Sequence, residues 1–161
     1  MPAPEQTPVL QKKLFSAEET EAFGVFLSPY FQAGDIVKIT GSLGAGKTTL
    51  VRGIVSGLGG NLAAVHSPTF SIVHQYRTES LSVIHCDFYR LPKDSELEDL
   101  GGAEFFDEAK LYLLEWPERA EAILSTIPNR LLGVNLGINA NCHEVTLLGA
   151  WQIVDQIITG C

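Results

Sequence analysis

Basic residues are scarce in this chain. Its 161 residues include 11 Lys and Arg against 19 Asp and Glu, so the formal net charge is −8 at pH 7. Proteins that hold nucleic acid along its phosphate backbone rely on clustered Lys and Arg side chains. The composition therefore argues against strong direct binding of nucleic acid.

Long apolar runs and paired cysteines are also missing. The N-terminal segment MPAPEQTPVLQKK has no apolar core like that of a signal peptide, and no run elsewhere is long and apolar enough to span a membrane. Cys86, Cys142 and Cys161 are odd in number and share no CxxC spacing, which predicts free thiols and neither a disulfide framework nor a zinc site. We expect a cytoplasmic protein with no membrane association.

Length and pattern predict one α/β domain over residues 1–161. A capping-box spacing of Ser16 and Glu19 predicts a helix from about Ala17 to Phe31. Further helices are expected at 48–58, 94–108 with a break at Gly101-Gly102, 117–124 and 151–160. Strands are expected at 9–15, 36–40, 71–77, 82–90, 110–116, 130–139 and 143–150. Because two pairs of these strands look like hairpins, we expect a mixed sheet.

The stretch GSLGAGKTT, residues 41–49, matches the phosphate-binding pattern G-x-x-x-x-G-K-[ST]. Its glycines let the backbone curl so that several N–H groups point at one anion, and the following helix presents its positive end to the same place. Lys47 can reach the β and γ phosphates, and the Thr48 hydroxyl is the expected Mg²⁺ ligand. With a strand before it and a helix after it, the motif predicts binding of a nucleoside triphosphate.

Two acids are candidates for the residue that holds Mg²⁺ or orients its waters. Asp87 follows the segment VIHC and Glu115 follows LYLL, so both are expected at the carboxyl ends of strands, where open α/β sheets bind ligands. The apolar run before Glu115 is cleaner, but the pattern leaves open which acid is the main metal ligand. Ser67 or Thr69 in SPTF could sense the γ phosphate, and Arg90 is interpreted as a salt-bridge former at the sheet edge.

Four segments taken together resemble one family. LGAGKTT, SPTFSIVHQY, HCDFYRL and LLEWPER follow one another, from about residue 41 to 119, in the order typical of the TsaE family, also called YjeE. These are small bacterial P-loop ATPases of tRNA threonylcarbamoyladenosine synthesis. The resemblance implies a three-layer α/β/α P-loop NTPase-like fold with a mixed central sheet, and it is far more specific than the phosphate loop alone.

The resemblance also implies roles for particular residues. Thr48 and Glu115 look like the Mg²⁺ ligands, and Asp87 looks like the second acid near the metal or the attacking water. Ser16 and Ala17 would lie near the adenine through backbone contacts. The loop residues that would hold the phosphates are Gly44, Ala45, Gly46, Lys47, Thr48 and Thr49.

Two further residues and one further segment are interpreted through the same likeness. It favours Thr69 as a switch residue and Trp116 as a functional aromatic residue. The family commonly carries an arginine in a C-terminal hairpin that approaches the nucleotide, whereas this sequence has NANCHE at 139–144. Either His143 or Asn141 substitutes there, or the contact is missing.

The function implied is an ATP-binding, Mg²⁺-dependent ATPase that cycles a TsaD–TsaB-like partner complex, with Lys47, Asp87 and Glu115 as catalytic residues. Turnover in isolation is expected to be slow, because no residue is an obvious arginine finger, and the partner would hold the tRNA. The acidic run from Asp94 to Glu108 is either a solvated helix face or a docking face for that partner.

Two alternatives remain open at this level. A small-molecule or nucleotide kinase uses the same loop in a chain of about this length, but such enzymes close an arginine-bearing lid over the transferred phosphate. The five arginines here are dispersed: Arg52, Arg77, Arg90, Arg119 and Arg130. The other alternative is a nucleotide-binding module that never hydrolyses its ligand.

Overall fold

The computed structural model describes residues 8–67, 72–91, 98–99, 101–127, 131–149 and 151–159. The predictions made for Thr69, Asp94 and Cys161 lie outside these ranges. The strands are β1 (Pro8–Leu14), β2 (Ile36–Gly41), β3 (Val73–Arg77), β4 (Ser82–Asp87), β5 (Lys110–Glu115), β6 (Leu131–Ile138) and β7 (His143–Gly149). The α-helices are α1 (Ala17–Leu27), α2 (Lys47–Gly57), α4 (Glu121–Leu124) and α5 (Trp151–Thr159). The 3₁₀ helices are η1 (Ser28–Tyr30), η2 (Leu62–Ala64), η3 (Gly102–Phe105) and η4 (Pro117–Ala120).

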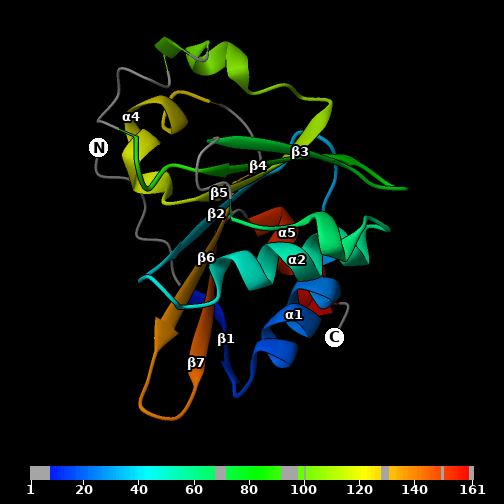
Figure 1. Ribbon diagram of the computed structural model, residues 1–161, viewed down its shortest axis with the longest axis vertical. Coiled ribbons are helices and arrows are strands. Elements are labelled where there is room, and N and C mark those ends of the chain that lie inside the picture. Colours follow the sequence, from blue (N-terminus) through cyan, green and yellow to red (C-terminus); the bar gives the residue numbers. More distant parts are fainter. Residues whose placement is uncertain are drawn as a thin grey trace.

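Within the described residues the strands form one seven-stranded sheet in the order β1-β7-β6-β2-β5-β4-β3 (Figure 1). The four central strands β6, β2, β5 and β4 run parallel, because β2 pairs in parallel with both β5 and β6, and β5 pairs in parallel with β4. The pairs β1–β7, β6–β7 and β3–β4 are antiparallel. The sheet is therefore mixed, and both predicted hairpins are confirmed.

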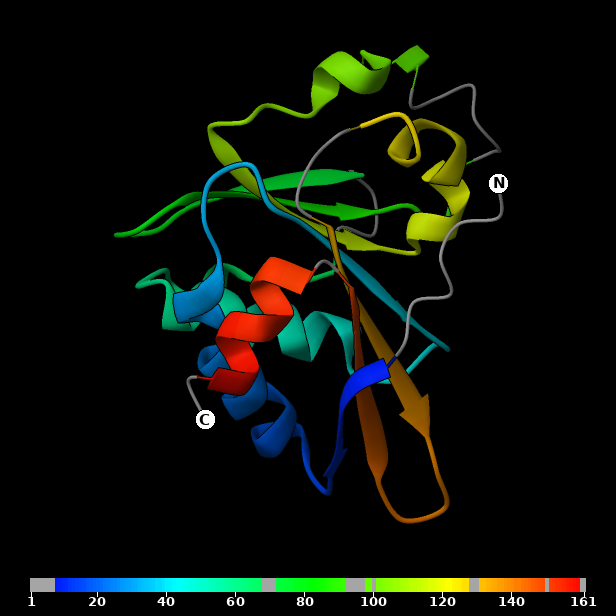
Figure 2. The ribbon, with the colours of Figure 1, turned by 180° about the vertical axis from the view of Figure 1, so that it is seen from behind.

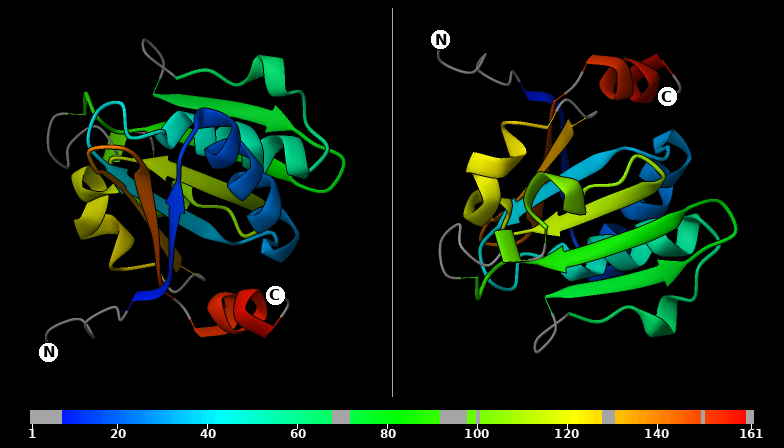
Figure 3. Two further views of the ribbon diagram at one scale, coloured as in Figure 1. Left: turned by 90° about the horizontal axis from the view of Figure 1, so that it is seen from below. Right: turned by 90° about the horizontal axis from the view of Figure 1, so that it is seen from above.

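Two apolar cores lie on opposite faces of the sheet, so the fold has three layers (Figures 1, 2 and 3). Side chains alternate between the faces along each strand: on β5, Leu111 and Leu113 join the first core and Tyr112 and Leu114 join the second. Helices α1, α2 and α5 contribute to the first core, and α4, with residues near η3, contributes to the second. The predicted three-layer α/β/α fold is confirmed.

Helix α1 lies directly against α2, which brings its first turn beside the phosphate loop. Two glycines permit this approach. A Cβ at Gly24 would lie 2.5 Å from the Leu50 carbonyl oxygen, and a Cβ at Gly53 would overlap the Glu21 carbonyl oxygen. Because neither position can hold a larger side chain without moving a backbone, the glycines determine the distance between the two helices.

Three predicted boundaries were wrong for local reasons. Helix α1 ends at Leu27 and not Phe31, because Pro29 cannot donate a backbone hydrogen bond, and the chain continues as η1. Strand β4 ends at Asp87 and not residue 90, because the Asp87 carboxylate accepts the Tyr89 backbone N–H at 3.0 Å and turns the chain. The helix predicted at 117–124 begins as the 3₁₀ turn η4 before α4.

Candidate functional site

The phosphate loop joins the end of β2 to the first turn of α2. Gly44 and Gly46 adopt φ angles of 78° and 100°, in the left-handed region that favours glycine. Gly41 is constrained by space, because a Cβ there would lie 2.5 Å from the Leu136 carbonyl oxygen. Gly46 is the N-cap of α2, and none of the described side chains caps that end. The first N–H groups of the helix are thus available to an anion.

Lys47 is folded back onto its own loop. Its Nζ donates hydrogen bonds to the carbonyl oxygens of Gly41 and Ser42, each at 2.8 Å, and lies 4.5 Å from the ring centroid of Trp116. Burial lowers the pKa of Lys47, while the charges of Glu115 and Asp87 oppose this shift. The ammonium group is therefore held at the loop on neutral acceptors that a phosphate can replace.

Thr48 and Glu115, the two expected Mg²⁺ ligands, are in contact. The Thr48 hydroxyl donates to Glu115 Oε1 at 2.9 Å, and the Glu115 residue is only 3% exposed. The pairing of β2 with β5 explains the contact: Ile39 is in register with Glu115, so this carboxylate emerges at the same sheet edge as the loop. The two residues that the resemblance pairs are thus in contact, and whether they bind a metal ion remains a prediction.

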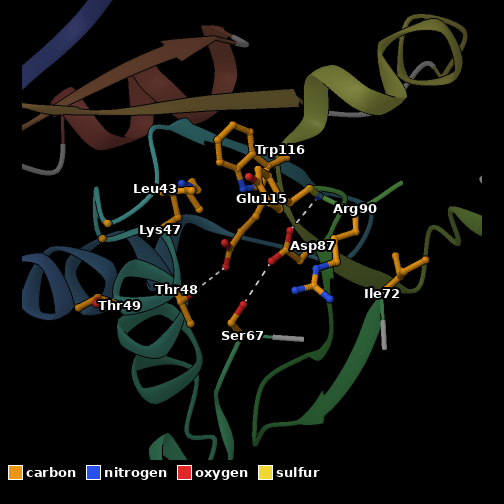
Figure 4. Close-up of a pocket in the computed structure, with 13 residues that line it drawn as sticks. Leu43, Lys47, Thr48, Thr49, Ser67, Ile72, Asp87, Arg90, Glu115 and Trp116 are labelled. Atoms are coloured by element: carbon orange, nitrogen blue, oxygen red, sulfur yellow. Dashed lines mark hydrogen bonds between the residues drawn. The ribbon is translucent and has the colours of Figure 1, made fainter. Parts of the chain in front are cut away.

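Asp87 lies beside Glu115 on the neighbouring strand β4, where the two residues are in register. Its Oδ2 accepts a hydrogen bond from the Ser67 hydroxyl at 3.2 Å, and both contacts of this carboxylate are drawn in Figure 4. Arg90 lines the same space. It is exposed and forms no ion pair with any residue that the structure describes, so the predicted salt bridge is not found among them.

These residues surround a cavity of about 620 Å³, shown in Figure 4. A volume of this size is typical of small-molecule sites. The described residues that line it come from the loop, from the ends of β4 and β5, and from the segments beside β3: Leu43, Gly44, Gly46, Lys47, Thr48, Thr49, Ser67, Ile72, Asp87, Tyr89, Arg90, Glu115 and Trp116. The cavity thus contains every predicted catalytic residue.

A second cavity, of about 490 Å³, lies on the other side of the loop. Gly44, Gly46 and Thr49 line both cavities. The rest of its lining combines the start of α1 with the β6–β7 hairpin: Leu14, Phe15, Ser16, Ala17, Thr20, Ile138, Asn139, Ala140, Asn141, Cys142 and His143. The structure therefore brings the expected adenine-side residues Ser16 and Ala17 together with both hairpin candidates for the missing arginine.

The start of α1 that the spacing of Ser16 and Glu19 predicts is confirmed, with the Glu19 side chain bonded to the residue before the N-cap. Ser16 Oγ accepts the Glu19 backbone N–H at 3.1 Å, and Glu19 Oε2 accepts the Phe15 backbone N–H at 2.9 Å. This reciprocal pair fixes the chain where it enters the second cavity. Ala45, in contrast, lines neither cavity; it is fully buried in the first core, so only its backbone can face a phosphate.

Sequence reasoning missed His85, which lies in the segment VIHC before Asp87. His85 is fully buried, and its Nε2 lies 2.9 Å from Glu115 Oε1. Its other ring nitrogen, Nδ1, lies 3.1 Å from the Tyr76 hydroxyl. The alternation in VIHCD places His85 and Asp87 on one face of β4, so a parallel pairing of β4 with β5 would have predicted the contact.

The donor set fits a magnesium ion. Thr48 and Glu115 offer hard oxygen ligands, and Mg²⁺ takes few protein oxygens because it keeps several waters. Among the described residues no three His, Cys, Asp or Glu side chains are grouped so as to hold a metal ion by themselves. No helix within the described ranges is long and apolar enough to cross a membrane.

A glycine-rich loop between β2 and α2, with two acids at the carboxyl ends of the parallel strands β4 and β5, defines a P-loop NTPase-like α/β protein. The crystal structure of Bacillus subtilis YdiB has this fold too. It superposes with a TM-score of 0.71 over 94% of this chain and 92% of that chain, at 24% sequence identity.

The family follows from sequence comparison. A family model described as threonylcarbamoyl adenosine biosynthesis protein TsaE matches residues 14–144. The tRNA threonylcarbamoyladenosine biosynthesis protein TsaE of Haemophilus influenzae is 33% identical over 135 residues, covering 84% of this chain and 83% of that protein. The protein of the same name from Bacillus subtilis is 38% identical over 112 residues, covering 70% and 69%. The chain belongs to the TsaE family, as the sequence motifs predicted.

Proposed function

We propose that this protein is a magnesium-dependent ATPase that supports threonylcarbamoyladenosine modification of tRNA by cycling a TsaD–TsaB-like partner complex. One observation carries the ATPase part: the 2.9 Å contact between Thr48 Oγ1 and the buried Glu115 carboxylate, at the start of a helix that no described side chain caps. A loop built only to hold phosphate has no need of a buried acid beside its hydroxyl.

The residues divide the work between binding and activation. The loop amides from residue 44 to 49 and the Lys47 ammonium bind the phosphates and stabilise the charge that develops on them. A magnesium ion held by Thr48 and Glu115 would neutralise further charge on the β and γ phosphates. Asp87, whose carboxylate accepts from the Ser67 hydroxyl and the Tyr89 N–H, would orient the attacking water.

The role in tRNA modification rests on the family and on charge. The matched family model and the relatives from Haemophilus influenzae and Bacillus subtilis are all named for threonylcarbamoyladenosine biosynthesis. A net charge of −8 is unsuited to holding tRNA directly, so a partner complex is the better candidate for that task. Work on cytoplasmic tRNA would place the protein in the cytoplasm.

A turnover experiment separates this function from its alternatives. Phosphate release from MgATP is measured for the chain alone and with TsaD, TsaB and tRNA, beside Glu115→Gln and, as a control, Glu118→Gln at an exposed neighbouring position. We expect slow hydrolysis alone, stimulation by the partners, loss of turnover in Glu115→Gln and no change in the control. Intact ATP after long incubation with the full partner set would refute the ATPase, and phosphate appearing on a small hydroxyl acceptor would indicate a kinase.

A further inference from the structure

A chain of hydrogen bonds runs from the phosphate loop into the core and out to the edge strand β3. Thr48 Oγ1 and His85 Nε2 both lie 2.9 Å from the same carboxylate oxygen, Glu115 Oε1. The Tyr76 hydroxyl lies 3.1 Å from His85 Nδ1 and 3.4 Å from His74 Nδ1. Strand pairing produces this alignment, because His74 lies directly opposite His85 across β3 and β4.

Donors and acceptors can be assigned along this series of hydrogen bonds so that each bond has one of each. An ionised carboxylate only accepts, so a neutral His85 that bonds to it carries its proton on Nε2, which leaves Nδ1 as an acceptor. The Tyr76 hydroxyl can then donate to that Nδ1. Burial raises the pKa of Tyr76 above its usual value, which keeps this hydroxyl protonated. The Tyr76 oxygen can in turn accept from His74 Nδ1, so each bond in the chain has one donor and one acceptor.

The two oxygens of the Glu115 carboxylate are therefore not equivalent. Oε1 accepts from Thr48 and from His85, whereas no described residue donates a hydrogen bond to Oε2. A glutamate has several rotatable bonds, and fixing one oxygen from a fully buried ring restricts where the other points. The Oε2 atom is the one left for a metal ion or one of its waters.

We propose that His85 is a positioning residue for Glu115: its Nε2–H fixes Oε1 so that Oε2 faces the magnesium site, and Tyr76 selects the His85 tautomer that can do so. This inference rests on the proposed function, since it assumes that Glu115 acts on a nucleotide-bound metal. His85 does not touch nucleotide or metal in this scheme. It resembles the hydrogen-bond partners that orient ligating side chains in other metal sites.

The placement of a histidine here favours this role over simple packing. Two residues lie next to His85 on the same face of the sheet: Val83, two positions earlier on β4, and Leu113, its partner on β5. Both are fully buried apolar residues of the first core. An apolar side chain at position 85 would fill the space without needing two buried hydrogen-bond partners. The chain instead buries a polar ring whose two nitrogens are both engaged.

The test measures how much magnesium strengthens nucleotide binding. For each full-length variant, calorimetry gives the dissociation constant of ADP with Mg²⁺ and with EDTA, and the ratio of the two is the magnesium linkage. His85→Leu removes the donor to Oε1 and keeps a side chain of similar size. His85→Gln keeps an N–H at about the reach of Nε2. Val83→Ala is the matched control, because it perturbs the same face of β4 without removing a hydrogen bond.

We expect the magnesium linkage to fall about tenfold or more in His85→Leu, the usual effect of losing an outer partner of a metal ligand. His85→Gln should keep a linkage near that of the wild type. Val83→Ala should lower the melting temperature and leave the linkage unchanged. If His85→Leu does not fold, Tyr76→Phe provides the second variant, and its linkage should also fall.

Two results would overturn the inference. The first is a magnesium linkage that stays equal to that of the wild type in His85→Leu, or in Tyr76→Phe where that variant is used. The second is an equal fall in Val83→Ala, since general loosening of β4 would then explain the loss. A wild-type protein with no magnesium linkage at all is a different failure, because it would refute the proposed function itself.

Discussion

Replacing Lys47 by methionine should weaken the binding of MgADP about 100-fold. In the free protein the Lys47 Nζ is bonded to two carbonyl oxygens at 2.8 Å, and the residue is 5% exposed, so most of the cost of removing its water is already met. A nucleotide would replace these neutral acceptors with charged phosphate oxygens. Hydrogen bonds to charged groups contribute about 1.5–3 kcal/mol each. Two such bonds, less the loop contacts given up, leave a net loss of about 3 kcal/mol, or roughly 100-fold in Kd.

Methionine suits this experiment because it keeps an unbranched stem beside the Trp116 ring while removing the charge. Calorimetry with MgADP gives the affinity directly. Lys38→Met is the control, because Lys38 lies on β2, the strand that leads into the phosphate loop. Its Nζ lies 3.7 Å from the exposed Glu121 carboxylate, and exposed ion pairs of this kind contribute little to stability. An unchanged Kd in Lys47→Met, or an equal loss in the control, would refute the assignment of Lys47 to the phosphates.

Three other predictions concern the charge of Lys47, the packing of α1 against α2, and the acidic run. Burial lowers the pKa of Lys47, so its charge should be lost at a lower alkaline pH than that of an ordinary lysine. The affinity for MgADP should fall over the same pH range, and Lys47→Met should not show this fall. Calorimetry across the alkaline range checks both. Gly53→Ala gains about 1 kcal/mol of helix propensity, but the new Cβ overlaps the Glu21 carbonyl oxygen, so thermal melting should show a net loss of stability, whereas Gly137→Ala, with its nearest contact at 3.8 Å, should show little change. A variant that combines Glu98→Lys, Glu104→Lys and Glu108→Lys reverses charges on the described part of the acidic run. Its association with TsaD–TsaB, measured by surface plasmon resonance, should be weaker than that of the wild type, and unchanged binding would refute the docking hypothesis.

Much of the site could be predicted from the sequence, because its signals are local. The loop pattern needs only neighbouring residues, and an acid at the end of an apolar strand is visible before any strand is paired. The capping box of Ser16 and Glu19 is local as well, and it is confirmed. These features predicted that Lys47, Asp87 and Glu115 would meet, and the structure brings them into one cavity.

The features that were missed depend on pairing between distant segments. The contact of His85 with Glu115 requires the register of β4 against β5, and the bond from Tyr76 requires the register of β3 against β4. Periodicity within a strand shows which face a residue occupies but not which residue lies opposite. The arrangement of Ser16 and His143 around one cavity likewise depends on α1 and the β6–β7 hairpin meeting at the loop, which only the resemblance suggested.

A crystal structure of the protein with MgADP would show which residues hold the phosphates and the metal ion. We expect the phosphates on the amides of residues 44–49 with Lys47 Nζ moved onto them, and a metal ion beside Thr48 Oγ1 and Glu115 Oε2. Phosphates bound away from the loop, or a metal ion on Asp87 with Glu115 turned elsewhere, would contradict this expectation.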